Sequence, residues 1–177
     1  MKMMRVAAAA MVATALAIAP LAAQSGDPMT KATKAQFDMV KGYITKAAEQ
    51  VGEDNYAFKP TPEVRSFGQL IGHVADSNYM ICAAAAGEKS PASGIEKSAT
   101  TKAALQKVLA EAFAYCDKVF AGMTEKKGEE LVTFFGNQQP KLAVLAFNTS
   151  HDFEHYGNIV TYMRLKGMVP PSSQRGM

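Results

Sequence analysis

Residues that bind metals or cofactors are scarce in this sequence, which has two cysteines and three histidines among 177 residues. No CxxCH haem-attachment motif, P-loop, GxSxG elbow or dinucleotide fingerprint occurs, so these common sites are excluded. Lysine and arginine are scattered among acidic residues instead of clustered, and no basic patch indicates nucleic-acid binding. The chemistry of the protein therefore depends on few side chains.

Only one apolar run is long, and it lies at the N-terminus. Lys2 and Arg5 precede an uncharged stretch from Val6 to Ala19, and Pro20 and "LAAQ" follow. This pattern predicts a secretory signal peptide over residues 1–23, because the run is too short to span a bilayer comfortably. A retained N-terminal anchor is the alternative. We expect a periplasmic or secreted protein with no membrane span after cleavage.

The remaining residues, 24–177, are predicted to form a single domain that is long enough to bury a core. Loss of Lys2 and Arg5 lowers the formal charge from +3 to +1, so the isoelectric point near 8.8 partly reflects the signal peptide. An oxidising compartment permits Cys82 and Cys116 to pair. A disulfide between two helices and two buried free thiols both remain open interpretations.

Helical periodicity dominates the chain after the signal peptide. Helices are predicted over residues 30–51, 66–86, 101–122 and 140–166. Ser66 and Gln69 match a capping box, and Gly87 is a typical helix end. The segment 87–100 reads as a plain loop and 124–140 as irregular, with only "LVTFF" as a weak strand candidate. We expect an all-α four-helix bundle whose connections of about 12 to 17 residues are long enough for crossovers.

Two of the three histidines lie four residues apart on the last predicted helix. Four steps along an α-helix place His151 and His155 one turn apart on the same face. This face continues with uncharged residues that include hydrogen-bonding side chains, namely Val144, Asn148, Asn158 and Tyr162. A solvent-facing stripe would carry Lys and Glu instead. The pair therefore indicates a site inside the bundle.

The third histidine, His73, flanks the apolar stripe of the second predicted helix. Together with His151 and His155 it predicts a three-histidine site for a divalent metal ion, with Zn²⁺ or Ni²⁺ favoured and water completing the shell. Asp76 and Glu154 are candidate catalytic residues, either as acceptors for imidazole N–H groups or as a general base. The pattern is not HExxH, because the residue after the first histidine is an aspartate.

The segments "RSFGQLIGHVADSNYM" and "NTSHDFEHYGNIVTYMRLKGMVPPSS" resemble the DinB-like superfamily, which includes the YfiT-type proteins. The resemblance implies a DinB/YfiT-like four-helix bundle with a metal held by one histidine of the second helix and an HxxxH pair of the last helix. His73, His151 and His155 match these positions. Relatives include thiol-dependent transferases and isomerases and are mostly cytoplasmic, whereas this chain has a predicted signal peptide.

We therefore expect a metal-dependent hydrolase or a thiol-transferase-like enzyme acting on a small molecule, with no nucleic-acid partner. The alternatives are a non-catalytic module that binds a metal or small ligand, and a metal-free bundle with structural histidines. A homodimer through exposed helix faces is compatible with such a bundle.

Overall fold

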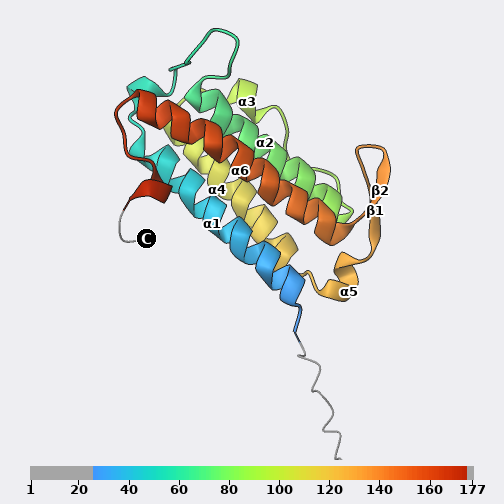
Figure 1. The fold of residues 1–177 in the computed structure, drawn as a ribbon. Helices are drawn as coiled ribbons and strands as arrows, with labels where there is room; N and C mark the ends of the chain where they lie inside the picture. Colours follow the sequence, from blue (N-terminus) through green and yellow to red (C-terminus); the bar gives the residue numbers. More distant parts are fainter. Residues whose placement is uncertain (1–25, 175–177) are drawn as a thin grey trace, which may run out of the picture.

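Four long helices form the body of the molecule (Figure 1). The computed structural model describes residues 26–174, so the signal peptide predicted over residues 1–23 lies outside the described residues. The long helices are α1 (Pro28–Gln50), α2 (Phe67–Ala86), α4 (Lys102–Ala121) and α6 (Lys141–Leu165). The prediction of an all-α bundle is confirmed.

Six short elements occupy the connections. They are η1 (Glu53–Asn55), α3 (Ile95–Ser98), α5 (Glu125–Gly128), β1 (Leu131–Phe134), β2 (Asn137–Pro140) and η2 (Pro171–Ser173). The strands pair antiparallel, with Leu131 opposite Pro140. The prediction of a plain loop was wrong, because that segment contains α3. The weak strand candidate "LVTFF" is confirmed as β1, whereas its partner β2 was not predicted.

Two diagonal links explain why the connections are long. Both α1 and α2 pack against α4 and α6, so α1 and α2 lie at opposite corners of the bundle. The chain must therefore cross a diagonal between α1 and α2, and again between α4 and α6. In addition, α2 and α4 run parallel, since the α2 residues Gly72 and Cys82 lie against Leu105 and Cys116, respectively. The segment between them returns along the bundle.

Local signals fix both ends of α2. The Ser66 hydroxyl accepts a hydrogen bond from the backbone N–H of Gln69 at 3.1 Å, and the Gln69 side chain accepts one from the Ser66 N–H at 2.9 Å. Gly87 ends the helix with a φ of 76°, which a residue without a Cβ adopts easily. The predicted boundaries of this helix are confirmed, so His73 lies in its second turn.

A disulfide links α2 to α4 in the centre of the bundle. Cys82 and Cys116 are fully buried and bonded, with their Cα atoms 5.4 Å apart. Of the two interpretations left open by the sequence, the structure has the disulfide. Within residues 26–174, no helix combines the length and the apolar character needed to cross a bilayer.

Candidate metal centre

Three histidine side chains converge between α2 and α6. The Nε2 atoms of His151 and His155 are 3.0 Å apart, and the ring of His73 lies with its centroid 4.6 Å from that of His155. One nitrogen from each of the three rings lies within 4.8 Å of the others. His155 is 7% exposed, and the other two rings are partly buried. The structure thus brings together the three residues predicted as ligands.

The separation of the two Nε2 atoms fits a shared metal ion. Nitrogens that bind one Zn²⁺ at roughly 2.0–2.1 Å lie about 3 Å apart. The remaining ring nitrogens, Nδ1 of His151 and of His155, are buried and have no hydrogen-bond partner among residues 26–174. Among residues 26–174 the two rings hydrogen-bond only to each other, through Nε2, so a metal ion bound at these nitrogens displaces no other partner. The group can therefore hold a metal ion.

The environment keeps all three imidazoles neutral, which is the form that binds metals. Burial is the first cause of a lowered pKa at each histidine, and the pKa of His155 falls to about 3. Mutual repulsion lowers the pKa of His151 and His155 further. The charge of Arg65 acts on all three in the same direction.

Glu96 is a contact of the centre that the sequence did not reveal. Its Oε2 accepts a hydrogen bond from His73 Nδ1 at 3.2 Å, and its Oε1 accepts one from Arg65 Nε at 3.0 Å. Because a carboxylate only accepts, the His73 proton lies on Nδ1 and Nε2 keeps its lone pair. The Ser77 hydroxyl lies at a long 3.5 Å from this Nε2, and a metal ion bound there would replace that contact. Glu96 thus fixes the tautomer of one of the three candidate ligands.

Asp76 holds Glu96 in place. Its two carboxylate oxygens accept hydrogen bonds from the backbone N–H groups of Ile95 and Glu96 at 3.0 and 2.9 Å. Gly72 permits the close approach of α3, since a Cβ there would lie 2.8 Å from the Cα of Glu96. Asp76 was expected to accept an N–H from a ligand imidazole, and the structure gives it these backbone partners instead.

Glu154, the other predicted catalytic residue, is exposed on α6. Its carboxylate accepts no hydrogen bond from any residue between 26 and 174, while its charge acts on His151. It therefore lies near the centre with a free carboxylate, and a role as general base stays a prediction.

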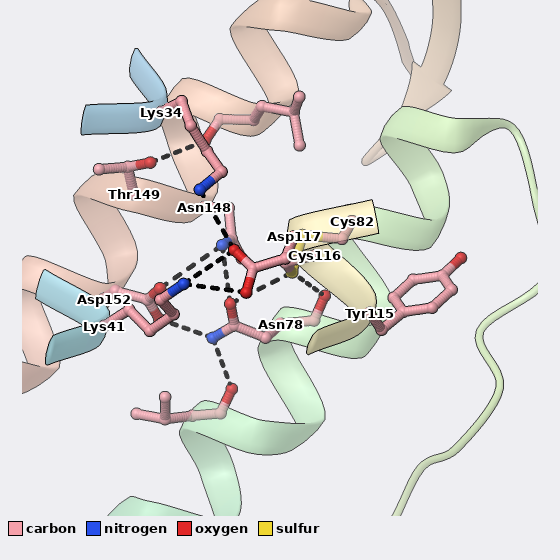
Figure 2. The surroundings of a disulfide bond; sticks show 12 residues. Lys34, Lys41, Asn78, Cys82, Tyr115, Cys116, Asp117, Asn148, Thr149 and Asp152 are labelled. Carbon is pink, nitrogen blue, oxygen red and sulfur yellow. Dashed lines mark hydrogen bonds and ion pairs between the residues drawn. A yellow bond between two sulfur atoms is a disulfide. The ribbon is translucent and has the colours of Figure 1, made fainter. Parts of the chain in front are cut away.

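A buried polar cluster lies beside the centre, formed by Asn78, Asn148 and Asp152. Asn78 Nδ2 donates to Asp152 Oδ1 at 2.8 Å, and Asn148 Nδ2 donates to Asn78 Oδ1 at 2.9 Å. Burial raises the pKa of Asp152 to about 8. Figure 2 shows the cluster next to the Cys82–Cys116 disulfide. It ties α2 to α6 and so fixes the spacing of the histidines.

The residues of the polar stripe predicted on α6 do not all belong to the histidine group. Asn148 has no exposed surface and belongs to the buried cluster, not to the histidine group. Tyr162 is buried, and its hydroxyl donates to the carbonyl of Arg65 at 2.6 Å.

Comparison with known protein families identifies the family of this chain. The DinB superfamily profile matches residues 36–159, and the metal-ligand candidates all lie within this range. The chain belongs to the DinB superfamily. Its relative YjoA of Bacillus subtilis, an uncharacterized protein, is 26% identical over 134 residues, which cover 72% of this chain and 84% of that protein.

Solved structures show the same fold as this DinB-superfamily chain. The DinB-like crystal structure of Bacillus subtilis YjoA has a TM-score of 0.66 at 22% identity, covering 82% of this chain and 99% of that one. A DinB-like protein of Bacillus cereus has a TM-score of 0.70 at 15% identity, covering 80% and 95%. A mycothiol-dependent maleylpyruvate isomerase has a TM-score of 0.61 at 15% identity, covering 73% and 60%.

Replacing Glu96 with glutamine is expected to weaken Zn²⁺ binding about tenfold or more. The amide cannot accept from His73 with the strength of a carboxylate, and loss of such outer partners costs roughly 10–100-fold in metal affinity. Calorimetric titration of Zn²⁺ measures the change. Glu154→Gln removes the same charge from a free carboxylate and is expected to change affinity less than about threefold. Equal losses in both variants would show that Glu96 acts only through its charge.

The metal-free protein is expected to be most stable near pH 6.5. Its histidines have pKa values below those of the unfolded chain, so their contribution is complete above about pH 6.5 and is lost as the pH falls. Asp152 has a raised pKa, so its contribution is lost as the pH rises through about 8. Denaturant midpoints measured between pH 4 and 9 test both the rise in stability below pH 6.5 and the fall above it. The Asp152 contribution declines over the whole range from about pH 4 to about pH 8. Asp152→Asn should therefore remove the fall in stability between pH 6.5 and 8 and steepen the rise between pH 4 and 6.5, and an unchanged fall above pH 6.5 contradicts the assignment.

Proposed function

We propose that this protein binds one divalent metal ion through His73, His151 and His155 and is a metal-dependent hydrolase acting on a small molecule. The observation that carries the proposal is the convergence of three neutral imidazoles from two helices in a chain with only three histidines. Nitrogen donors of this kind favour Zn²⁺ or Ni²⁺.

Three protein ligands suit a catalytic centre because they leave a coordination position open. When bound, the ion would polarise a substrate carbonyl or phosphoryl oxygen, or lower the pKa of water. The chain supplies the remaining functions. Glu96 fixes the tautomer of His73, and Glu154 is the preferred general base because both oxygens of Asp76 are already used by backbone N–H groups.

We further propose that the protein is exported to the periplasm or the exterior. The signal-peptide pattern of residues 1–23 and the buried Cys82–Cys116 disulfide both support an oxidising compartment. Thiol transfer, suggested by the fold shared with a mycothiol-dependent isomerase, suits such a compartment less well. Hydrolysis is therefore preferred to thiol transfer.

The test is a substrate screen with the protein expressed from residue 24. Ester, amide and phosphoester substrates are offered with Zn²⁺, with Ni²⁺ and after chelation, each with and without a low-molecular-weight thiol. We expect hydrolysis that requires metal, does not require thiol and is lost in His155→Ala. Thiol-dependent turnover would replace the hydrolase with a transferase. Stoichiometric metal without turnover of any substrate would favour a non-catalytic binding module.

A further inference from the structure

A cavity of about 670 Å³ opens beside the metal centre. It lies between α6 and the connection that joins α1 to α2. The residues that line it include Glu63, Arg65, Glu96, His155, Asn158 and Tyr162. Because His155 and Glu96 belong to both the cavity and the centre, a molecule in this cavity reaches the proposed metal position.

Arg65 is held at the cavity in a defined position. Its Nε donates to Glu96 at 3.0 Å, and its carbonyl accepts from the Tyr162 hydroxyl at 2.6 Å. The terminal nitrogens of its guanidinium group have no hydrogen-bond partner among residues 26–174, and the side chain is 41% exposed. These two terminal nitrogens can donate two parallel hydrogen bonds to one carboxylate or phosphate group.

The charge balance of the cavity favours an anion once a metal is bound. Glu63 and Glu96 contribute two negative charges, whereas Arg65 and a divalent ion contribute three positive ones. Both oxygens of Glu96 are already engaged by Arg65 and His73. Asn158 adds an uncharged amide to the wall, donating to the Glu154 carbonyl at a long 3.3 Å. The cavity lining and a bound ion together thus carry one net positive charge, while the free carboxylate of Glu154 lies near the centre and outside this lining.

We propose that Arg65 binds an oxyanion of the substrate, a carboxylate or a phosphate, and places the reacting group of the same molecule at the three-histidine centre. The position of the oxyanion site rests on the cavity and on Arg65, whereas the net positive charge of the cavity and the placement of the reacting group rest on the proposed function. The substrate class is therefore a small acid with a second polar group a few bonds from its charge.

Calorimetry with three probes tests this assignment. Glycolate carries a carboxylate beside a hydroxyl group that can coordinate a metal, glycolamide is its uncharged match, and inorganic phosphate represents the other oxyanion source. Each is titrated into the Zn²⁺-loaded protein and into the metal-free protein. We expect at least one oxyanion to bind at least tenfold more tightly than glycolamide, and the tighter of the two oxyanions identifies the source.

Variants in the same connection locate the binding. Arg65→Gln is expected to weaken oxyanion binding at least tenfold, and Arg65→Lys, which keeps the charge without the fork, to weaken it less. Lys59→Gln removes an exposed cation that lines a different cavity and should change affinity less than twofold. Thermal midpoints confirm that each variant is folded.

The outcomes separate this inference from the proposed function. Equal oxyanion affinity in Arg65→Gln and the wild type, or no preference of the wild type for oxyanions over glycolamide, overturns the inference. Absence of bound metal in the wild type overturns the proposed function. Oxyanion binding to the metal-free protein is expected to be weaker, because the cavity lining alone carries one net negative charge, and its dependence on Arg65 would still support the oxyanion site.

Discussion

Replacing His151 with alanine is expected to lower the affinity for Zn²⁺ or Ni²⁺ at least about 100-fold. The substitution removes one of three ligands, and even the loss of an outer contact costs roughly 10–100-fold. The two remaining rings would share the ion with additional water. The pair with Nε2 atoms 3.0 Å apart no longer exists in this variant. Competition with a chromophoric chelator measures affinities in this range.

Ser150 provides the matched control on the same helix. It is exposed, and within the described part of the chain its hydroxyl donates only to the carbonyl of Ala146. Ser150→Ala should leave metal affinity unchanged, since the side chain does not face the histidines. If His151→Ala retained the affinity of the wild type, His151 would not be a ligand and the centre would need another composition.

Removing the disulfide is expected to have the largest effect on stability. Cys82 and Cys116 are separated by 34 residues. Loop-closure entropy for a loop of this size gives a stabilisation of about 3–4 kcal/mol. The double variant Cys82→Ala/Cys116→Ala should therefore show a free energy of unfolding lower by about this amount in guanidinium titrations.

Chemical reduction is the control for this experiment. Reductant should destabilise the wild type and leave the double variant unaffected, because only the wild type has a bond to lose. The metal affinity of the folded double variant should stay within about threefold, since the histidines lie on α2 and α6 and the disulfide joins α2 to α4. Equal stability of the double variant and the oxidised wild type would contradict the disulfide.

Much of the bundle follows from signals inside single segments. The capping box of Ser66 and Gln69 and the left-handed Gly87 fix α2, and Gly167 follows the end of α6 with a φ of 70°. The spacing of His151 and His155 predicts their shared face because four residues make about one helical turn. These features need no knowledge of the rest of the fold.

The elements that the sequence did not reveal depend on contacts between distant segments. The four-residue helix α3 has its first N–H groups bound by Asp76, about twenty residues earlier. The hairpin has strands of only four residues, and Phe135 in its turn has a φ of 47°. Gly136, the second turn residue, has a φ of 79° and is the glycine that such a turn favours. Phe135 stands where Asn or Asp is usual, and a positive φ is uncommon for a bulky side chain, so only half of the usual turn signal is present.

The same reason explains what was missed around the centre. Asp152 follows His151 directly, and one helical step of 100° turns its side chain into the core. The sequence of α6 alone does not tell that Asp152 faces the core. Its orientation follows from the position of α2, where Asn78 donates a hydrogen bond to it. Glu96 and Arg65 come from connections, where periodicity gives no orientation. The convergence of the three histidines was predictable from the sequence, and the residues that surround them were not.

The most direct test of the metal centre is the metal content of the untagged protein, purified without chelating resin and analysed by elemental mass spectrometry. We predict close to one Zn²⁺ or Ni²⁺ per chain in the wild type and almost none in His151→Ala. A wild-type protein that contains no metal and binds neither ion when it is added would contradict the account. The three histidines would then be structural residues of the bundle.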